Sequence, residues 1–256
     1  MNFSKMAKQD GIVPIKGTIG NLTFYKGKEG FQVRSKGGVN ASRIANDPAF
    51  QRTRENGAEF SRAGKAGKVL RSGLRQLLLN VSDSRMIGRL LKEMMRIIKS
   101  DILNPRGSRN VIDGDVTLLQ GFEFNANSNL GTTLFAPFSQ SIDRATGQLA
   151  VNIPAFVPSS MIIAPGGTTH FKITAAAAEV DFFSEVSTVE MNSTGELPWN
   201  SVATQPINLV NNLSPNSNKP LFLVLGIQFL QVVNGTVYPL KSGAFNAVAI
   251  VGVSKV

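Results

Sequence analysis

The single histidine of this chain, His170, limits the nucleophilic chemistry that the sequence can support. A Ser-His-Asp triad would have to use that imidazole, with Asp181 or Asp143 as the carboxylate that orients it. No Gly-x-Ser-x-Gly motif exposes a nucleophilic serine, and there is no cysteine to replace it. His170 follows two glycines at the start of a predicted strand, where a surface or hydrogen-bonded histidine is the ordinary outcome. We therefore predict that the chain is not an enzyme.

Metal chemistry is limited to all-oxygen sites, because the chain has no cysteine and one histidine. Asp113 and Asp115 form a close carboxylate pair, which we interpret as a turn at a domain boundary. Glu179 and Asp181 share a strand face, as a glycosidase pair would, but no aromatic platform flanks them and a solvated edge is the better interpretation. We expect no cofactor and no small-molecule substrate.

Two glycine pairs resemble parts of phosphate-binding loops. Gly17-x-x-Gly20 lacks a following Lys-Ser/Thr and opens a strand, so it is neither a P-loop nor a dinucleotide fingerprint. Gly64-x-x-Gly67 lies inside a helical pattern and predicts a close helix-packing face.

Basic side chains are the one group of residues that indicates a ligand. Lysine and arginine bind the phosphates of nucleic acid or the carboxylates of an acidic protein surface. The candidate contacts to a polyanion or a neighbouring subunit are Arg34, Lys36, Arg43, Arg52, Arg54, Arg62, Lys65, Lys68, Arg71, Arg75, Arg85, Arg89, Lys92 and Arg96. In the helix expected around Arg62 to Arg75, these charges spread over more than half of the circumference. Tyr25 and Phe31 are candidates for stacking on bases, but both also suit a ribbon core.

Charge is divided unequally along the 256 residues, whose formal net charge is +10. Residues 1–109 hold 22 basic and 8 acidic residues, and residues 110–256 hold 5 and 9. This asymmetry predicts a polyanionic partner for the first part, or a second copy whose acidic part meets it. A pair of solvated basic helices is the simpler alternative. Hydrophobic residues make up 42% of the chain, enough for a folded core.

The elements that must position these residues change in type along the chain. Residues 11–37 predict short strands at 12–16, 22–26 and 31–35, with turns at 17–20 and 26–30. Asp47 before Pro48 predicts a helix start, and 3–4 spacing continues from Phe60 to Leu77. Ser82 is expected to cap a second helix that folds back on the first.

Beyond the break at 104–108 the pattern is β throughout. An Asn234-Gly235 turn predicts the clearest hairpin. The strands are expected near 116–125, 132–138, 146–153, 168–178, 180–190, 205–210, 220–233, 235–241 and 244–255.

The opening of the chain carries the motifs Gly17-x-Ile19-Gly20-Asn21, Lys26-x-Lys28-x-Gly30 and Val33-Arg34-x-Lys36, followed by Asp47-Pro48-x-Phe50-x-x-x-Arg54-Glu55-Asn56. In these motifs the first 75 residues resemble a protein family common in Bacteroidota genomes, and the later residues resemble it in outline. No activity is established for that family, so the resemblance transfers no site residue.

The predicted fold class is α+β: an N-terminal β-ribbon and an antiparallel helical hairpin, followed by an all-β antiparallel sandwich of jelly-roll or immunoglobulin-like type. The expected domains are a basic ribbon arm (1–38), a basic helical hairpin (39–109) and a β-sandwich (110–256).

Two functions fit these patterns. The first is a self-assembling structural protein, such as a virion, tail-like or filament subunit, whose basic N-terminal ribbon adds to the sheet edge of a neighbouring copy. The second is a nucleic-acid-binding protein with basic helices on phosphates. A carbohydrate- or protein-binding β module is a third, weaker hypothesis.

The N-terminus has no apolar signal segment and no stretch predicts a membrane span, so we expect cytoplasmic synthesis, with a virion or extracellular assembly as an alternative final location.

Overall fold

A computed structural model describes residues 6–9, 11, 13–240 and 243–256. The chain forms two compact units, Met1–Arg54 and Glu55–Val256. The fold class is α+β with antiparallel sheets, as predicted. Within the described residues no helix combines the length and the apolar character that crossing a membrane requires.

The first unit contains a small antiparallel sheet with the strand order β1-β4-β3-β2. Its strands are β1 (Met6–Lys8), β2 (Gly17–Ile19), β3 (Leu22–Gly27) and β4 (Gly30–Ser35). Gly27 lies opposite Gly30, so the predicted turn at 26–30 is confirmed. The predicted strand at 12–16 is wrong for residues 13–16, which form no strand, and Ile12 lies outside the described residues. Residues 17–19, expected in a turn, form β2 instead.

Two short helices follow this sheet, α1 (Ala41–Asn46) and the 3₁₀ helix η1 (Pro48–Phe50). A carboxylate oxygen of Asp47 accepts a hydrogen bond from the Ala49 N–H at 2.9 Å, which confirms the predicted Asp47-Pro48 helix start. Helix α2 (Gln51–Gly73) then begins in the first unit, and most of its residues belong to the second.

In the second unit, α2 is followed by α3 (Arg75–Leu78) and α4 (Met86–Ser100). A Cβ added at Gly67 would lie 3.6 Å from Leu90 and 3.7 Å from Met94, so the predicted close packing at this glycine is confirmed. The prediction that Ser82 caps α4 is wrong. The Asp83 carboxylate instead accepts a hydrogen bond from the Arg85 N–H before the helix begins.

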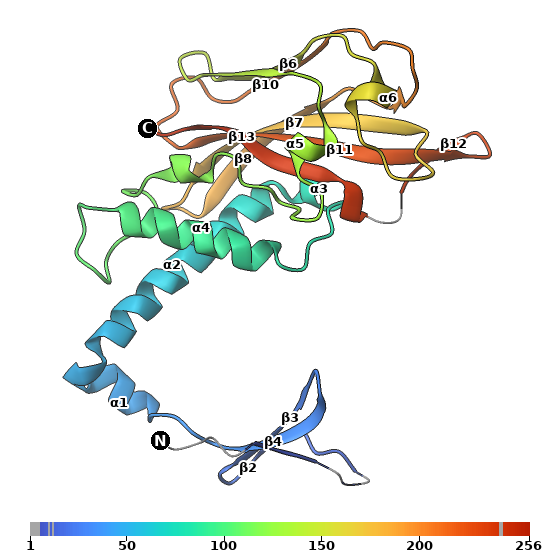
Figure 1. Cartoon of the computed structure of the whole chain (residues 1–256). Coiled ribbons are helices and arrows are strands. Elements are labelled where there is room, and N and C mark those ends of the chain that lie inside the picture. Colours follow the sequence, from blue (N-terminus) through green and yellow to red (C-terminus); the bar gives the residue numbers. More distant parts are fainter. Residues whose placement is uncertain (1–5, 10, 12, 241–242) are drawn as a thin grey trace. The chain divides into compact units, whose positions relative to one another are not determined.

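Antiparallel strands of the second unit form two sheets (Figure 1). The central sheet has the order β12-β11-β7-β8, with β13 also paired to β11 and β9 to β7. Its strands are β7 (His170–Asp181), β8 (Val186–Ser193), β9 (Leu197–Pro198), β11 (Leu221–Val233), β12 (Thr236–Pro239) and β13 (Ala247–Ser254). The smaller sheet is β10-β6-β5, formed by β5 (Ser139–Asp143), β6 (Gln148–Ile153) and β10 (Ile207–Asn212).

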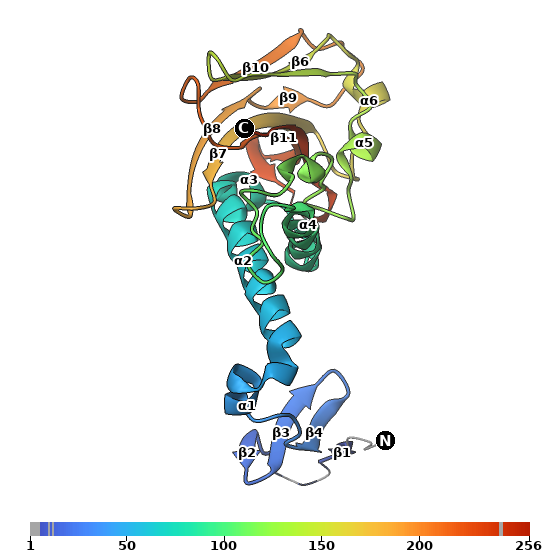
Figure 2. The ribbon, with the colours of Figure 1, turned by 90° about the vertical axis from the view of Figure 1, so that its left-hand side faces the viewer.

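The central sheet is the middle of three layers in this unit (Figure 2). On one face Ala176 and Ala178 join a core with residues of α2 and α4. On the other face Ala175 and Ala177 join a second core with the smaller sheet. Because both faces of β7 are buried, its centre carries small apolar side chains on each side instead of an alternating pattern.

Two predicted strands are wrong. Residues 116–119 form the 3₁₀ helix η2 (Val116–Leu119), because the Asp115 side chain accepts from Thr117 N–H and turns the backbone. The segment 121–124 that follows bonds to β13, with Phe124 N donating to Val248 O at 2.8 Å. The 132–138 stretch begins inside α5 (Leu130–Thr133) and makes only an isolated bridge at Leu134. The remaining short elements are α6 (Pro158–Met161) and η3 (Gly243–Phe245).

The predicted Asn234-Gly235 hairpin is confirmed. Asn234 has φ +51° and Gly235 φ +79°, the pair of positive values that a type I′ turn needs, and Val233 faces Thr236 across it.

The chain divides into units at a different position from the sequence-based division at 38 and 109. Helices α2 and α4 share one hydrophobic core with β7, β11 and β13, so the compact unit runs from Glu55 through the sheets. Helices whose apolar stripe is covered by a sheet do not form a separate domain.

Candidate interaction surfaces

The structure separates the residues of the candidate triad. His170 begins β7 and Asp181 ends it, so 12 residues of extended strand place their Cα atoms about 36 Å apart. His170 Nδ1 bonds to Thr169 Oγ1 at 3.0 Å, and Asp181 binds Lys219 Nζ at 2.8 Å. Asp143, the alternative carboxylate, binds Thr146 and Ala145 N–H in its own turn. These four contacts are local and structural.

The Asp113–Asp115 pair lies in a turn, as the sequence indicates. One Asp113 oxygen accepts from the side-chain amides of Asn104 and Asn110, at 2.8 Å each, and Asp115 caps η2. A Cβ at Gly114 would lie 2.3 Å from the Ile97 carbonyl oxygen, so this turn packs against the backbone of α4. Within the described residues no three His, Asp or Glu side chains lie together as a metal site would require.

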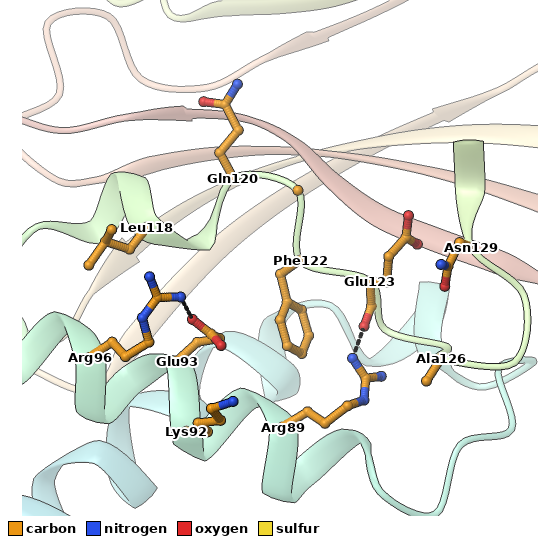
Figure 3. A pocket seen from close by; sticks show the side chains of 11 residues that line it. Arg89, Lys92, Glu93, Arg96, Leu118, Gln120, Phe122, Glu123, Ala126 and Asn129 are labelled. Carbon is orange, nitrogen blue, oxygen red and sulfur yellow. Dashed lines mark hydrogen bonds and ion pairs between the residues drawn. The ribbon is translucent and has the colours of Figure 1, made fainter. Parts of the chain in front are cut away.

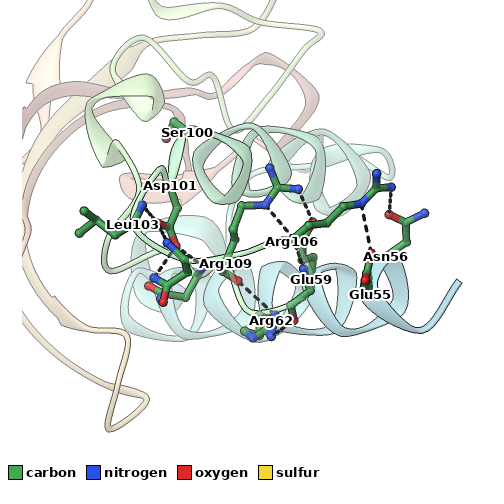
Figure 4. A network of polar contacts seen from close by, with 12 residues as sticks. Glu55, Asn56, Glu59, Arg62, Ser100, Asp101, Leu103, Arg106 and Arg109 are labelled. Carbon is green, nitrogen blue, oxygen red and sulfur yellow. Dashed lines mark hydrogen bonds and ion pairs between the residues drawn. The ribbon is translucent and has the colours of Figure 1, made fainter. Parts of the chain in front are cut away.

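Several candidate arginines hold the second unit together. Buried Glu59 on α2 accepts two bonds from Arg109, at 2.8 and 2.9 Å, and a third from the Gly107 N–H at 2.8 Å (Figure 4). The Arg109 guanidinium is the main cause that lowers the pKa of Glu59, against the opposing effect of burial. Arg62 donates to the carbonyl oxygens of Gly107 and Arg109. Arg62 is therefore a structural residue that fastens the loop after α4 to α2.

The basic residues of α4 lie on one side of that helix. At about 100° per residue, the four cations of the helix and Arg85 at its N-cap fall within an arc of about 80°. This stripe follows from the sequence, but we predicted the spread of charge only for the helix around Arg62 to Arg75. These residues, the α4 stripe, are Arg85, Arg89, Lys92, Arg96 and Lys99.

The α4 stripe borders a hollow of about 500 Å³ (Figure 3). Arg89 binds Asp83 at 2.6 Å and the Glu123 carbonyl oxygen at 2.7 Å. Arg96 binds Glu93 at 2.5 Å, and burial raises the pKa of Glu123. Most of the hollow's charges are thus paired within the chain.

The other predicted contacts also divide into residues that have a partner in the same chain and residues that have none among those described. Arg43 binds Asp47, Arg54 donates to two carbonyl oxygens, Lys65 lies 3.4 Å from Glu185 and Arg34 stacks on Tyr25. Arg52 also has an interaction. Six predicted contacts have no side-chain partner within the part of the chain that the structure describes: Lys36, Lys68, Arg71, Arg75, Arg85 and Lys92.

The described residues of the first unit form no buried core. None of the described residues between Ala7 and Arg54 is buried. Val13 is 76% exposed and Ile19 is 60% exposed. A small sheet with uncovered apolar side chains is expected to be marginally stable alone.

An acidic segment, residues 179–196, is a second surface that the sequence analysis did not single out as a whole. It contains five acidic residues and no basic one. Lys219 is the main cause that lowers the pKa of Asp181, and Glu185 faces Lys65. Glu190 and Glu196 are exposed and have no cationic partner among the described residues. Counting charge in short windows of sequence would have revealed this segment.

No family model and no curated protein sequence matches this chain. Among solved structures, one similar chain comes from the work titled "pH-induced modulation of Streptococcus parasanguinis adhesion by Fap1 fimbriae". The two chains are 11% identical, the match covers 48% of this chain and 83% of that one, and the TM-score is 0.25. A TM-score this low supports no inference about function.

Proposed function

We propose that this protein is a non-enzymatic, self-assembling structural protein, of the class of virion, tail-like or filament subunits, whose basic N-terminal ribbon contacts neighbouring copies. The observation that carries the proposal is the absence of any buried residue among those described between Ala7 and Arg54. The second unit, by contrast, has two extensive hydrophobic cores. A coreless module joined to a well-packed one is the arrangement expected of an assembly arm.

Charge favours a second copy as the partner of this arm. Residues 1–38 hold seven basic and two acidic residues, whereas in the acidic segment 179–196 Glu190 and Glu196 are exposed and have no cationic partner among the described residues. Opposite charge on two surfaces of the same chain favours head-to-tail association between copies, and heterologous contacts of that kind build rings or filaments.

Deletion of residues 1–37 tests this proposal. We expect the full chain to elute as a species much larger than a monomer in size exclusion with light scattering, with a protein-like 260/280 nm ratio. The deletion variant should be monomeric and should keep a cooperative thermal transition, because the cores of the second unit lie outside the deleted residues. Assembly that survives the deletion intact would refute the proposal.

The α4 stripe favours one alternative, a nucleic-acid-binding protein. Arg85, Lys92 and Lys99 lie on this stripe, are exposed, and have no partner among the described residues. Binding to duplex DNA should then weaken steeply with salt, and the log–log slope should fall by about 0.9 for each phosphate contact removed. Undetectable or salt-insensitive binding would exclude this alternative.

A further inference from the structure

Strand β8 presents an edge that pairs with no other strand. Among the described strands it pairs with β7 alone, and Figure 2 shows β8 at the margin of the central sheet. Thr194 N donates to Ile173 O, which fixes the alternation of the ladder: Thr188, Glu190 and Asn192 bond to β7. The N–H and C=O groups of the residues between them therefore point away from the sheet, and no described residue bonds to them.

Within the described residues no backbone group bonds to this edge, and near its end the Asn192 side-chain amide donates to the Val210 carbonyl oxygen of β10 at 3.3 Å. The eight residues of β8 include no lysine, proline or glycine, and the register against β7 continues without a bulge. At the opposite margin the chain covers its own edge, because Gly121 N and Phe124 N donate to β13. A long, regular edge without these protective features is a ready site for adding a strand.

The surroundings of the β8 edge indicate the chemistry of the strand that fits it. Glu190 and Glu196 are exposed and have no cationic partner among the described residues. Apolar side chains are exposed beside them, with Phe183 85% and Val186 59% accessible. A complementary strand would therefore be basic and carry exposed apolar side chains.

Strand β2 of the first unit meets that description. Ile19 in β2 is exposed, Lys16 precedes the strand, and Lys28 lies in the turn between the neighbouring strands β3 and β4. β2 is itself the edge of its sheet and pairs with β3 alone. Neither Lys16 nor Lys28 bonds to a carboxylate within the described residues.

Pairing of β8 with β8 of a second copy is disfavoured by the same charges. A two-fold contact would bring two acidic segments together, and juxtaposed like charges cost several kcal/mol. Such a closed dimer would also leave the apolar side chains of the ribbon uncovered.

We infer that the outward edge of β8 in one copy accepts β2 of a second copy, so that assembly proceeds by strand addition from the ribbon to the acidic margin of the central sheet. This inference rests on the proposed function and names the acceptor that the proposed function leaves open.

Cross-linking between different single-cysteine variants tests the contact directly, because the natural chain has no cysteine. A mixture of Thr18→Cys in β2 and Thr188→Cys in β8 should give a cross-linked dimer with a short bismaleimide. The matched control replaces Thr188→Cys with Gln148→Cys, an exposed residue of β6, and should give none. Equal cross-linking of both mixtures would overturn the inference.

Charge reversal gives a second test that does not depend on cross-linker reach. Glu190→Lys with Glu196→Lys should weaken assembly about tenfold or more, as should Lys16→Glu with Lys28→Glu. Mixing the two variants should restore assembly, because each ribbon then meets an acceptor of opposite charge. Gln148→Lys with Asn208→Lys adds two positive charges to the smaller sheet and should leave assembly unchanged.

The outcomes separate this inference from the proposed function. Normal assembly of the Glu190→Lys, Glu196→Lys variant, combined with loss of assembly on deletion of 1–37, would refute β8 as the acceptor and retain the assembly arm. A cross-link found within single chains, in a double-cysteine variant diluted with wild type, would also refute the contact between copies. A wild-type chain that stays monomeric would refute both.

Discussion

Charged side chains fall into two groups according to their partners. Arg62, Arg89 and Arg109 bind backbone carbonyl oxygens or carboxylates of the same chain, whereas Lys28 and Glu190 have no such partner within the described residues. Changes in the first group should lower stability, because they leave polar groups unpaired. Changes in the second group should alter association and leave stability nearly unchanged.

Glu59→Gln should lower the free energy of unfolding by about 3 kcal/mol, because it removes one partner of a buried ion pair and leaves the Arg109 guanidinium uncompensated. The Glu59 side chain is 2% exposed. Glu93→Gln is the matched control: its partner Arg96 is 56% exposed and can be solvated when the pair is lost, so the loss should cost at most about 1 kcal/mol. Urea denaturation measures both, and equal losses would contradict this account.

Acid should destabilise the second unit. The pKa values of Glu59 and Asp181 are lowered in the folded chain, by Arg109 and Lys219 respectively, so the unfolded chain binds protons more tightly. Their contribution is complete above the ordinary carboxyl values near 4 and is lost as the pH falls through the lower folded values. Urea midpoints should therefore fall between about pH 5 and pH 3, and Asp181→Asn should reduce this fall. A midpoint that rises over this range would contradict the prediction.

Among the elements, β7 owes its run of small side chains to its two buried faces. Alanines 175–178 let α2 and α4 approach on one face and the smaller sheet on the other, since short side chains fit between closely packed layers. A strand with one exposed face would need alternation instead, and β8 shows it, with exposed and half-buried residues in turn.

Alanine substitutions at two glycines test how tightly the elements pack. Gly114→Ala should destabilise the chain by about 1–3 kcal/mol, because its Cβ would collide with the Ile97 carbonyl at the end of α4. Gly64→Ala lies in α2 with nothing within 4 Å of the added Cβ, so the gain in helix propensity should stabilise the chain by about 0.5–1 kcal/mol. Thermal denaturation distinguishes them, and shifts in the same direction would contradict the packing described.

At the scale of the whole molecule, assembly should depend on salt. In the proposed assembly the basic ribbon and the acidic segment 179–196 would attract one another across an exposed contact, which about 0.5 M salt would screen strongly. Light scattering should therefore show smaller particles at high salt, without added nuclease and without loss of 260 nm absorbance. Particles that shed 260 nm absorbance as they shrink would favour nucleic-acid binding instead.

Local patterns of the sequence determined the elements whose geometry depends on neighbouring residues alone. Asn234-Gly235 specified its turn, because few other residue pairs accept two positive φ values, and Asp47-Pro48 specified a helix start. The pattern of apolar and polar residues over 116–125 predicts a strand. The Asp115 side chain closes a 3₁₀ turn there instead, and Gly121 takes φ +81°. The difference in charge between residues 1–109 and 110–256 also follows from the sequence alone.

Only the tertiary structure decided how these elements meet. The sheet covers the apolar stripes of α2 and α4, which merges the predicted hairpin and sandwich into one unit. The fold also covers the edge of β13 and leaves that of β8 without a partner in the described residues, and it assigns partners to Arg62 and Arg89. Periodicity reports which face of an element is apolar, but which surface covers that face depends on contacts between residues far apart in the chain.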